Sequence, residues 1–111
     1  MIRQCTASDF ETVLAIINDA AQAYRGIIPA DRWKEPYMPP DELRHEMDQG
    51  VLFHGYELGG ELGGVMGIQQ VQDVTLIRHA YVRTAMRNQG IGGRLLSYLH
   101  DRTTRPLLIG T

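Results

Sequence analysis

The stretch Arg87-Asn88-Gln89-Gly90-Ile91-Gly92-Gly93 decides how this sequence is interpreted. Ile91, Leu95 and Leu99 then recur at helical spacing, which predicts a helix over 90–103 that opens at this glycine turn. The first backbone N–H groups of a helix have no helical carbonyl to bind, and the helix dipole adds positive potential there. Because glycines leave this end open, the stretch predicts a phosphate-binding turn, with Arg87 adding a charged contact.

Two better-known phosphate-binding motifs do not fit this turn. A P-loop requires lysine and then serine or threonine after its last glycine, but Gly93 is followed by Arg94 and Leu95. A dinucleotide-binding fingerprint places its glycines early in a strand–helix–strand unit, with an acidic residue about 20 positions further on. Here the spacing is different, and the strands before the turn form a meander. A purely structural role, in which the glycines only permit a tight turn and close helix packing, stays open.

The residues before the turn predict an antiparallel meander. Strands are expected at 51–58, 61–71 and 74–82, joined by Gly59-Gly60 and by Gln72-Asp73. The second strand contains glycines that indicate a bulge or a close backbone approach, namely Gly63, Gly64 and Gly67. Alternation in the third strand predicts two faces, one with Leu76, Arg78, Ala80 and Val82 and the other with Thr75, Ile77, His79 and Tyr81.

The N-terminal part predicts a strand at 2–6 and a helix at 8–24. Ser8 and Glu11 have the spacing of a capping box at the start of this helix. Its apolar face is expected to consist of Phe10, Val13, Leu14, Ile17, Ala21 and Tyr24.

The connection over 25–40 is long and rich in proline. Its Trp33, Tyr37 and Met38 favour an ordered loop, which either lines a substrate site or is only packed at the surface. A second helix is expected at 41–49, with Leu43 and Met47 on its buried face.

Downstream of the turn, Pro106 precedes an apolar strand at 107–109. A strand, a helix and a strand at this spacing predict a parallel pair joined by a crossover helix. The expected fold class is therefore α/β (α+β), with a mixed sheet in which an antiparallel meander leads into a β-α-β crossover. One domain is expected over 1–111, since single cores typically occupy about 100–150 residues.

Composition excludes several classes of protein. Hydrophobic residues make up 43% and charged residues 22%, and the net charge is −2, so nothing indicates a nucleic-acid partner or a membrane surface. Cys5 is the only cysteine, which excludes an internal disulfide and a thiolate zinc cluster. We expect no metal, a cytoplasmic location, and a packing role for Cys5 rather than a nucleophilic one.

At this point the sequence resembles the GNAT acyltransferase superfamily. Arg87-Asn88-Gln89-Gly90-Ile91-Gly92 is similar to the Arg/Gln-x-x-Gly-x-Gly/Ala motif of that family, and Tyr81-Val82 ends a strand shortly before it, as in the family. The order of the predicted elements also matches, over essentially the whole chain. The resemblance implies acetyl-CoA as cosubstrate and transfer of its acetyl group to a primary amine of a small molecule or a peptide.

The resemblance also implies where acetyl-CoA binds. The cosubstrate would sit where the strand ending at Val82 splays from the strand at 107–110, with the amine approaching from the 25–40 loop. Backbone groups of Ala80, Tyr81 and Val82 would pair with the pantetheine arm, and the backbone amides of Gln89 to Gly93 would hold the pyrophosphate. An N–H near Val82 would bind the oxyanion. The candidate cofactor-binding residues are Ala80, Tyr81, Val82, Arg87, Asn88, Gln89, Gly90, Ile91, Gly92 and Gly93.

The general base departs from the family pattern. Family members often use a glutamate on the strand before the motif, but 74–82 contains no acidic residue. His79 lies in that stretch and is the candidate catalytic base, because histidine exchanges protons near neutral pH. Glu57, His54 and Tyr56 are lesser candidates, and a merely packed or solvated His79 stays open.

The family usually continues past the strand at 107–109 with a helix that carries a thiolate-protonating tyrosine, and then two more strands. We therefore expect a truncated form, a fragment, or a homodimer that completes its sheet through the exposed edge of that strand. A non-catalytic acyl-CoA-binding module or an inactive remnant is the alternative function, and a structural or interaction protein is the third.

Overall fold

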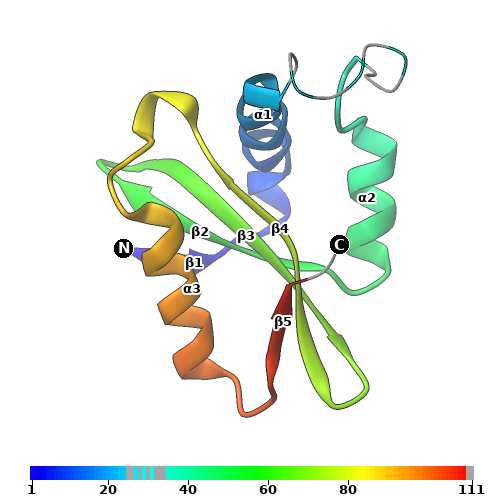
Figure 1. The fold of residues 1–111 in the computed structure, drawn as a ribbon, viewed down its shortest axis with the longest axis vertical. Helices are drawn as coiled ribbons and strands as arrows, with labels where there is room; N and C mark the ends of the chain where they lie inside the picture. The colour runs from blue at the N-terminus through cyan, green and yellow to red at the C-terminus, as the bar shows by residue number, and fades with distance from the viewer. Residues whose placement is uncertain (25–26, 28, 30, 32–34, 110–111) are drawn as a thin grey trace.

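The computed structural model describes residues 1–24, 27, 29, 31 and 35–109. Within them the strands form one mixed sheet in the order β1-β2-β3-β4-β5, in which only β4 and β5 are parallel (Figure 1). The main elements are β1 (Ile2–Gln4), α1 (Phe10–Ala21), α2 (Pro40–Asp48), β2 (Leu52–Leu58), β3 (Glu61–Val71), β4 (Val74–Val82), α3 (Ile91–Arg102) and β5 (Leu107–Ile109). Short 3-10 turns are η1 (Ala7–Asp9), η2 (Gln22–Tyr24) and η4 (Thr84–Met86). The predicted fold class, a meander followed by a β-α-β crossover, is confirmed.

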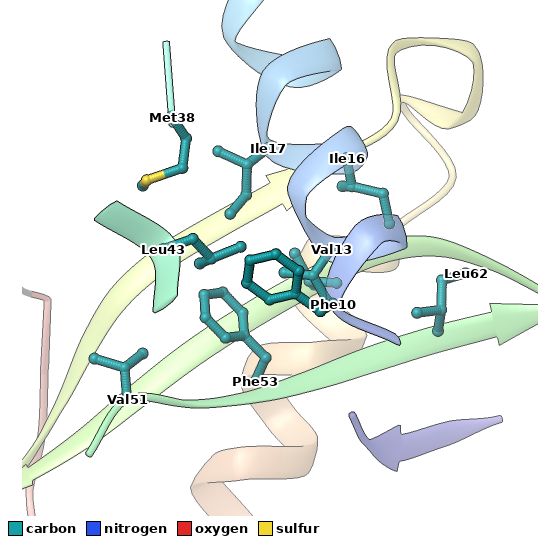
Figure 2. Packing of buried hydrophobic residues seen from close by; sticks show 10 residues of the cluster. Phe10, Val13, Ile16, Ile17, Met38, Leu43, Val51, Phe53 and Leu62 are labelled. Atoms are coloured by element: carbon teal, nitrogen blue, oxygen red, sulfur yellow. The ribbon is translucent and has the colours of Figure 1, made fainter. Parts of the chain in front are cut away.

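Helices cover both faces of the sheet, with α1 and α2 on one side and α3 on the other (Figure 1). On the first face, Phe10 of α1, Leu43 of α2 and Phe53 of β2 converge in one buried cluster (Figure 2). On the second face, the predicted stripe of Ile91, Leu95 and Leu99 is buried against the sheet. Two separate clusters thus fix the sheet between its helices.

The N-terminal cap differs from the prediction. The prediction of a capping box formed by Ser8 and Glu11 is wrong, because η1 begins the helical turn earlier and Thr6 is its N-cap. The Asp9 carboxylate accepts from the Thr6 backbone N–H at 2.7 Å, and the Asp9 N–H donates to the Thr6 carbonyl at 2.9 Å. Arg3 of β1 also donates to Asp9, at 2.8 and 3.0 Å, so the cap ties the first strand to the first helix.

The long connection lies partly outside the described residues, and Trp33 with it. Its end is packed rather than open: Met38 is buried and Tyr37 packs against the same cluster. The Asn18 side chain accepts from the Met38 N–H at 2.8 Å and donates to the Met38 carbonyl at 3.0 Å. These two bonds hold the start of α2 against α1.

The face prediction for β4 is wrong beyond Ile77. In the pairing with β3, His79 lies opposite Gly67 and Ile77 opposite Ile68, which leaves Arg78 as an extra residue. Such a bulge moves the following side chains to the other face of the sheet. Thr75 and Ile77 therefore face α3, whereas His79 and Tyr81 face α1 and α2.

Glycines in β3 permit a close approach, as the sequence predicted. A Cβ on Gly63 would lie 2.5 Å from Met86 Sδ, and one on Gly64 would lie 2.8 Å from Ile91 Cγ2. Real Cβ atoms do not come so close, so a side chain at either position would displace the Met86 side chain of η4 or Ile91 in the first turn of α3. The glycine turn is thereby held beside the end of β4.

We expect Leu95→Ala to lower the free energy of unfolding by about 2–5 kcal/mol, since it removes a buried side chain and leaves a cavity. Leu95 is 1% exposed, and the neighbouring Leu96 is 42% exposed. Urea unfolding of both alanine variants measures the difference, with Leu96→Ala as the matched control. Equal losses in the two variants would show that α3 does not dock through this stripe.

Acid should destabilise the protein through Asp9. The Arg3 guanidinium, helped by the Thr6 N–H, holds the pKa of the Asp9 carboxyl well below its usual range. A lowered folded-state pKa gives a stabilisation that is present above the unfolded pKa of about 4 and is lost as the pH falls further. Thermal unfolding between pH 7 and pH 2 should show a smaller drop below pH 4 for Asp9→Asn than for the wild type. An identical acid dependence in both proteins would refute this role.

Candidate functional site

The first part of the site is the turn that opens α3. Gly90 is the N-cap, with φ 77° and ψ 13°, a left-handed conformation that favours glycine. No side chain of the described residues caps this end, and the helical hydrogen bonds begin with the Arg94 N–H, which donates to the Gly90 carbonyl at 3.0 Å. The backbone N–H groups of 91–93 therefore have no carbonyl acceptor within the helix.

Helix packing does not explain the remaining glycines of this turn. A Cβ on Gly92 or Gly93 would meet nothing within 4 Å, in contrast to the crowded positions on β3. The space over these two residues is open, and neither has a positive φ. The glycines thus leave a helix N-terminus bare toward the outside, which suits an anion.

The segment between β4 and the turn is anchored to α1 and β3. The Thr84 N–H donates to Asp19 Oδ2 at 2.8 Å, and Arg83 Nε donates to the Leu62 carbonyl at 2.8 Å. Arg87 Nη2 donates to the Ala20 carbonyl at 3.5 Å, which places its guanidinium at the C-terminal end of α1. The turn is therefore held from both sides.

The second part of the site is the end of β4. In the described residues, β5 pairs with β4 only as far as Ile77 and Ile109, and β4 continues to Val82. On its other side, Ala80 pairs with Met66 and Val82 with Gly64 of β3. The edge that faces away from β3 in this part of β4 is suited to an extended ligand that hydrogen-bonds in the manner of a strand.

The third part is a histidine–glutamate pair. His79 Nε2 and Glu46 Oε1 of α2 lie 2.5 Å apart, and their side chains are only 12% and 16% exposed. The imidazole stacks on Phe53, with ring centroids 5.8 Å apart, and on Tyr81, at 6.0 Å. His79 lies two residues after Ile77, which forms the last β4–β5 pair among the described residues.

Sequence reasoning found His79 but missed Glu46. The two residues are 33 positions apart, so no local pattern connects them. One signal was available: Glu46 follows Leu43 by three positions and so shares the buried face of α2. An acidic residue on such a face needs a partner.

A family model described as the acetyltransferase (GNAT) domain matches residues 11–107. The chain belongs to the GNAT acetyltransferase family. A search of the curated proteins finds no match.

Solved structures share the GNAT fold. PaiA N-acetyltransferase from Thermoplasma acidophilum, in complex with coenzyme A, is 20% identical with a TM-score of 0.73, over 92% of this chain and 70% of that one. A mutant of the BH1408 protein from Bacillus halodurans is 18% identical with a TM-score of 0.80, over 100% and 82% of the two chains. Ribosomal-protein-alanine N-acetyltransferase from Brucella melitensis biovar Abortus 2308 is 20% identical with a TM-score of 0.74, over 100% and 80%.

In this GNAT domain the lesser base candidates do not join His79. Tyr56 and His54 lie on the α3 side of the sheet, where the Tyr56 hydroxyl accepts from Arg94 Nη1 at 2.7 Å and the His54 ring lies 6.0 Å from that of Tyr98. Burial, followed by the charge of Arg102, lowers the pKa of His54. Glu57 instead accepts from Arg3 Nε at 2.7 Å.

Cys5 of this GNAT domain packs against the cluster under α1, as predicted. Burial raises the pKa of its thiol to about 11, so little thiolate exists at neutral pH and a nucleophilic role is not supported. Among the residues that the structure describes, no three His, Cys, Asp or Glu side chains gather as metal ligands. No helix in the described ranges has both the length and the apolar character needed to cross a membrane.

Proposed function

We propose that the chain is an acetyl-CoA-dependent N-acetyltransferase that moves an acetyl group to a primary amine. One observation carries this proposal: the uncapped, glycine-opened N-terminus of α3 lies beside the end of β4, beyond the last β4–β5 pair that the described residues form. Membership of the GNAT family supports it, as does a structural neighbour that was solved with coenzyme A.

The pyrophosphate of acetyl-CoA fits the open turn. Backbone N–H groups from Gln89 to Gly93 would bind its oxygens, because the space over Gly90, Gly92 and Gly93 is open and these groups lie at the positive end of the helix dipole. Asn88 supports the turn with its own left-handed backbone, at φ 66°, and Arg87 adds a guanidinium next to it. The pantetheine arm would pair with the backbone of Ala80, Tyr81 and Val82 along the edge of β4.

The chemistry needs a base and an oxyanion donor. Acetyl-CoA supplies an activated thioester carbonyl. His79 lies near the end of the paired part of β4 and acts as the general base for the incoming amine. A backbone N–H near Val82 stabilises the negative charge that forms on the carbonyl oxygen.

The acceptor in this proposal is a small molecule or a peptide that carries a primary amine. A cytoplasmic location is proposed because a lone cysteine suits a reducing compartment. We also propose a homodimer formed through the outer edge of β5, where Leu108 is 49% exposed. Sedimentation over a range of concentrations tests the dimer, and a monomer throughout that range would refute it.

Two measurements together test the enzymatic proposal. Titration calorimetry should show acetyl-CoA binding, and thermal unfolding should shift upward with acetyl-CoA, since a ligand of the folded state stabilises it. Thiol release from acetyl-CoA is then measured with an alanine-initiated peptide, a polyamine and lysine as acceptors. Amine-dependent release supports the transferase, whereas binding without release supports a non-catalytic acyl-CoA-binding module. Absence of binding overturns both.

A further inference from the structure

The contact between α2 and β4 contains a side-chain pair, Glu46 and His79, that is not part of the proposed phosphate-binding turn. Glu46 is a carboxylate on the buried face of α2, and its Oε1 meets His79 Nε2 at 2.5 Å. Both side chains are largely withdrawn from solvent. Burying such a pair has a desolvation cost, so it contributes little to stability compared with apolar packing of the same volume. A role in the chemistry of His79 explains the pair better than stability does.

The geometry selects one tautomer of the imidazole. A neutral imidazole that pairs with a carboxylate donates to it, so in such a pair His79 Nε2 is the nitrogen that carries the proton. In a neutral imidazole the other nitrogen, Nδ1, then has a free lone pair. Within the described part of the chain, Nδ1 has no hydrogen-bond partner.

We propose that Glu46 is a positioning residue that fixes His79 in the tautomer whose Nδ1 accepts the proton of the acceptor amine. The inference rests on the proposed function, because it assigns the atom that performs its base step. Phe53 and Tyr81 support the same orientation, because the rings of both stack with the imidazole. Glu46 acts through His79 and does not itself touch the reacting atoms.

The proposed step balances as follows. The ammonium form of the acceptor loses one proton to His79 Nδ1, and the freed lone pair forms the N–C bond to the thioester carbonyl carbon. The C–S bond then breaks and its electron pair leaves with the sulfur of coenzyme A. The second proton of the amine ends on that thiolate, and His79 Nδ1 releases the first proton to solvent before the next turnover. While Nδ1 holds its proton, the imidazolium is stabilised by the negative charge of Glu46.

The tautomer is tested directly by nitrogen NMR of protein labelled in histidine. The chain has 4 histidines, and the His79→Gln spectrum identifies the signals of His79 by their loss. We expect a protonated Nε2 and an unprotonated Nδ1 in the wild type. In Glu46→Gln both signals should move toward intermediate values, because an amide can accept or donate and no longer selects one tautomer.

The matched control is Glu11→Gln, which removes the same charge at an exposed position of α1. It should leave the His79 signals unchanged. A wild-type His79 with its proton on Nδ1 would overturn the inference, and this measurement needs no variant of Glu46. An unchanged His79 pattern in a folded Glu46→Gln protein would overturn it as well.

Kinetics separate this inference from the proposed function. Thiol release by Glu46→Gln, with the best acceptor of the panel, should show kcat reduced about tenfold to a hundredfold at an unchanged KM for acetyl-CoA. Glu11→Gln should match the wild type. If wild-type protein does not bind acetyl-CoA, the proposed function fails. If it binds and turns over, but Glu46→Gln keeps full kcat, only the role of Glu46 fails.

Discussion

Glutamate in place of Gly92 is expected to weaken acetyl-CoA binding by about a hundredfold or more while the protein stays folded. A Cβ at this position meets nothing within 4 Å, so the substitution starts into open space and the fold is expected to tolerate it. Its carboxylate lies in the first turn of α3, where it competes with the pyrophosphate for the same N–H groups and repels it. The expected loss corresponds to about 2.7 kcal/mol of binding free energy.

Calorimetric titration with acetyl-CoA measures the change in dissociation constant, and thermal unfolding checks the fold. An acidic side chain near a helix N-terminus stabilises the helix, so the melting temperature of Gly92→Glu should be unchanged or slightly higher. Ser97→Glu is the matched control, because it adds the same charge to an exposed position of the same helix, farther from the turn. Equal affinities for Gly92→Glu and the wild type would remove the basis for the phosphate site.

Replacing His79 by glutamine should lower kcat by about a hundredfold or more, because a positioned general base typically contributes at least that factor. Glutamine approximates the size of the imidazole and can still donate to Glu46, but it cannot take up a proton at neutral pH. The affinity for acetyl-CoA should change by no more than about twofold, since His79 lies on the α1 and α2 side of the sheet, whereas the phosphate turn lies at the start of α3.

Single-turnover thiol release with excess enzyme measures the effect on the chemical step without product release. His54→Gln provides the control, because His54 lies on the opposite face of the sheet, beside Tyr98. A His79→Gln protein that retains the full rate would mean that another group, or solvent, takes the proton from the amine. The same rate loss in His54→Gln would indicate a general structural effect of losing a histidine from the sheet.

The elements of this fold were predictable from local patterns. The three meander strands and the helix after the glycine turn agree with the structure within a residue or two, because period-two alternation and helical spacing are written in the sequence itself. The glycines at 63 and 64 also signalled the close approach of α3. The first helix cap was misplaced because Thr6 and Asp9 compete with Ser8 and Glu11 for the same role, and the ion pair to Arg3 favours Asp9.

By itself, then, the sequence determined the fold class, the position of the turn at Gly90 and the choice of His79 as the base candidate, since each depends on residues close together in the chain. Only the tertiary structure decided which face His79 occupies and what it touches. The extra residue Arg78 reverses the alternation of β4, and a bulge of this kind depends on the pairing with β3. Glu46 reaches His79 because α2 packs over the sheet, a contact between residues 33 positions apart that arises only when the two core clusters have formed.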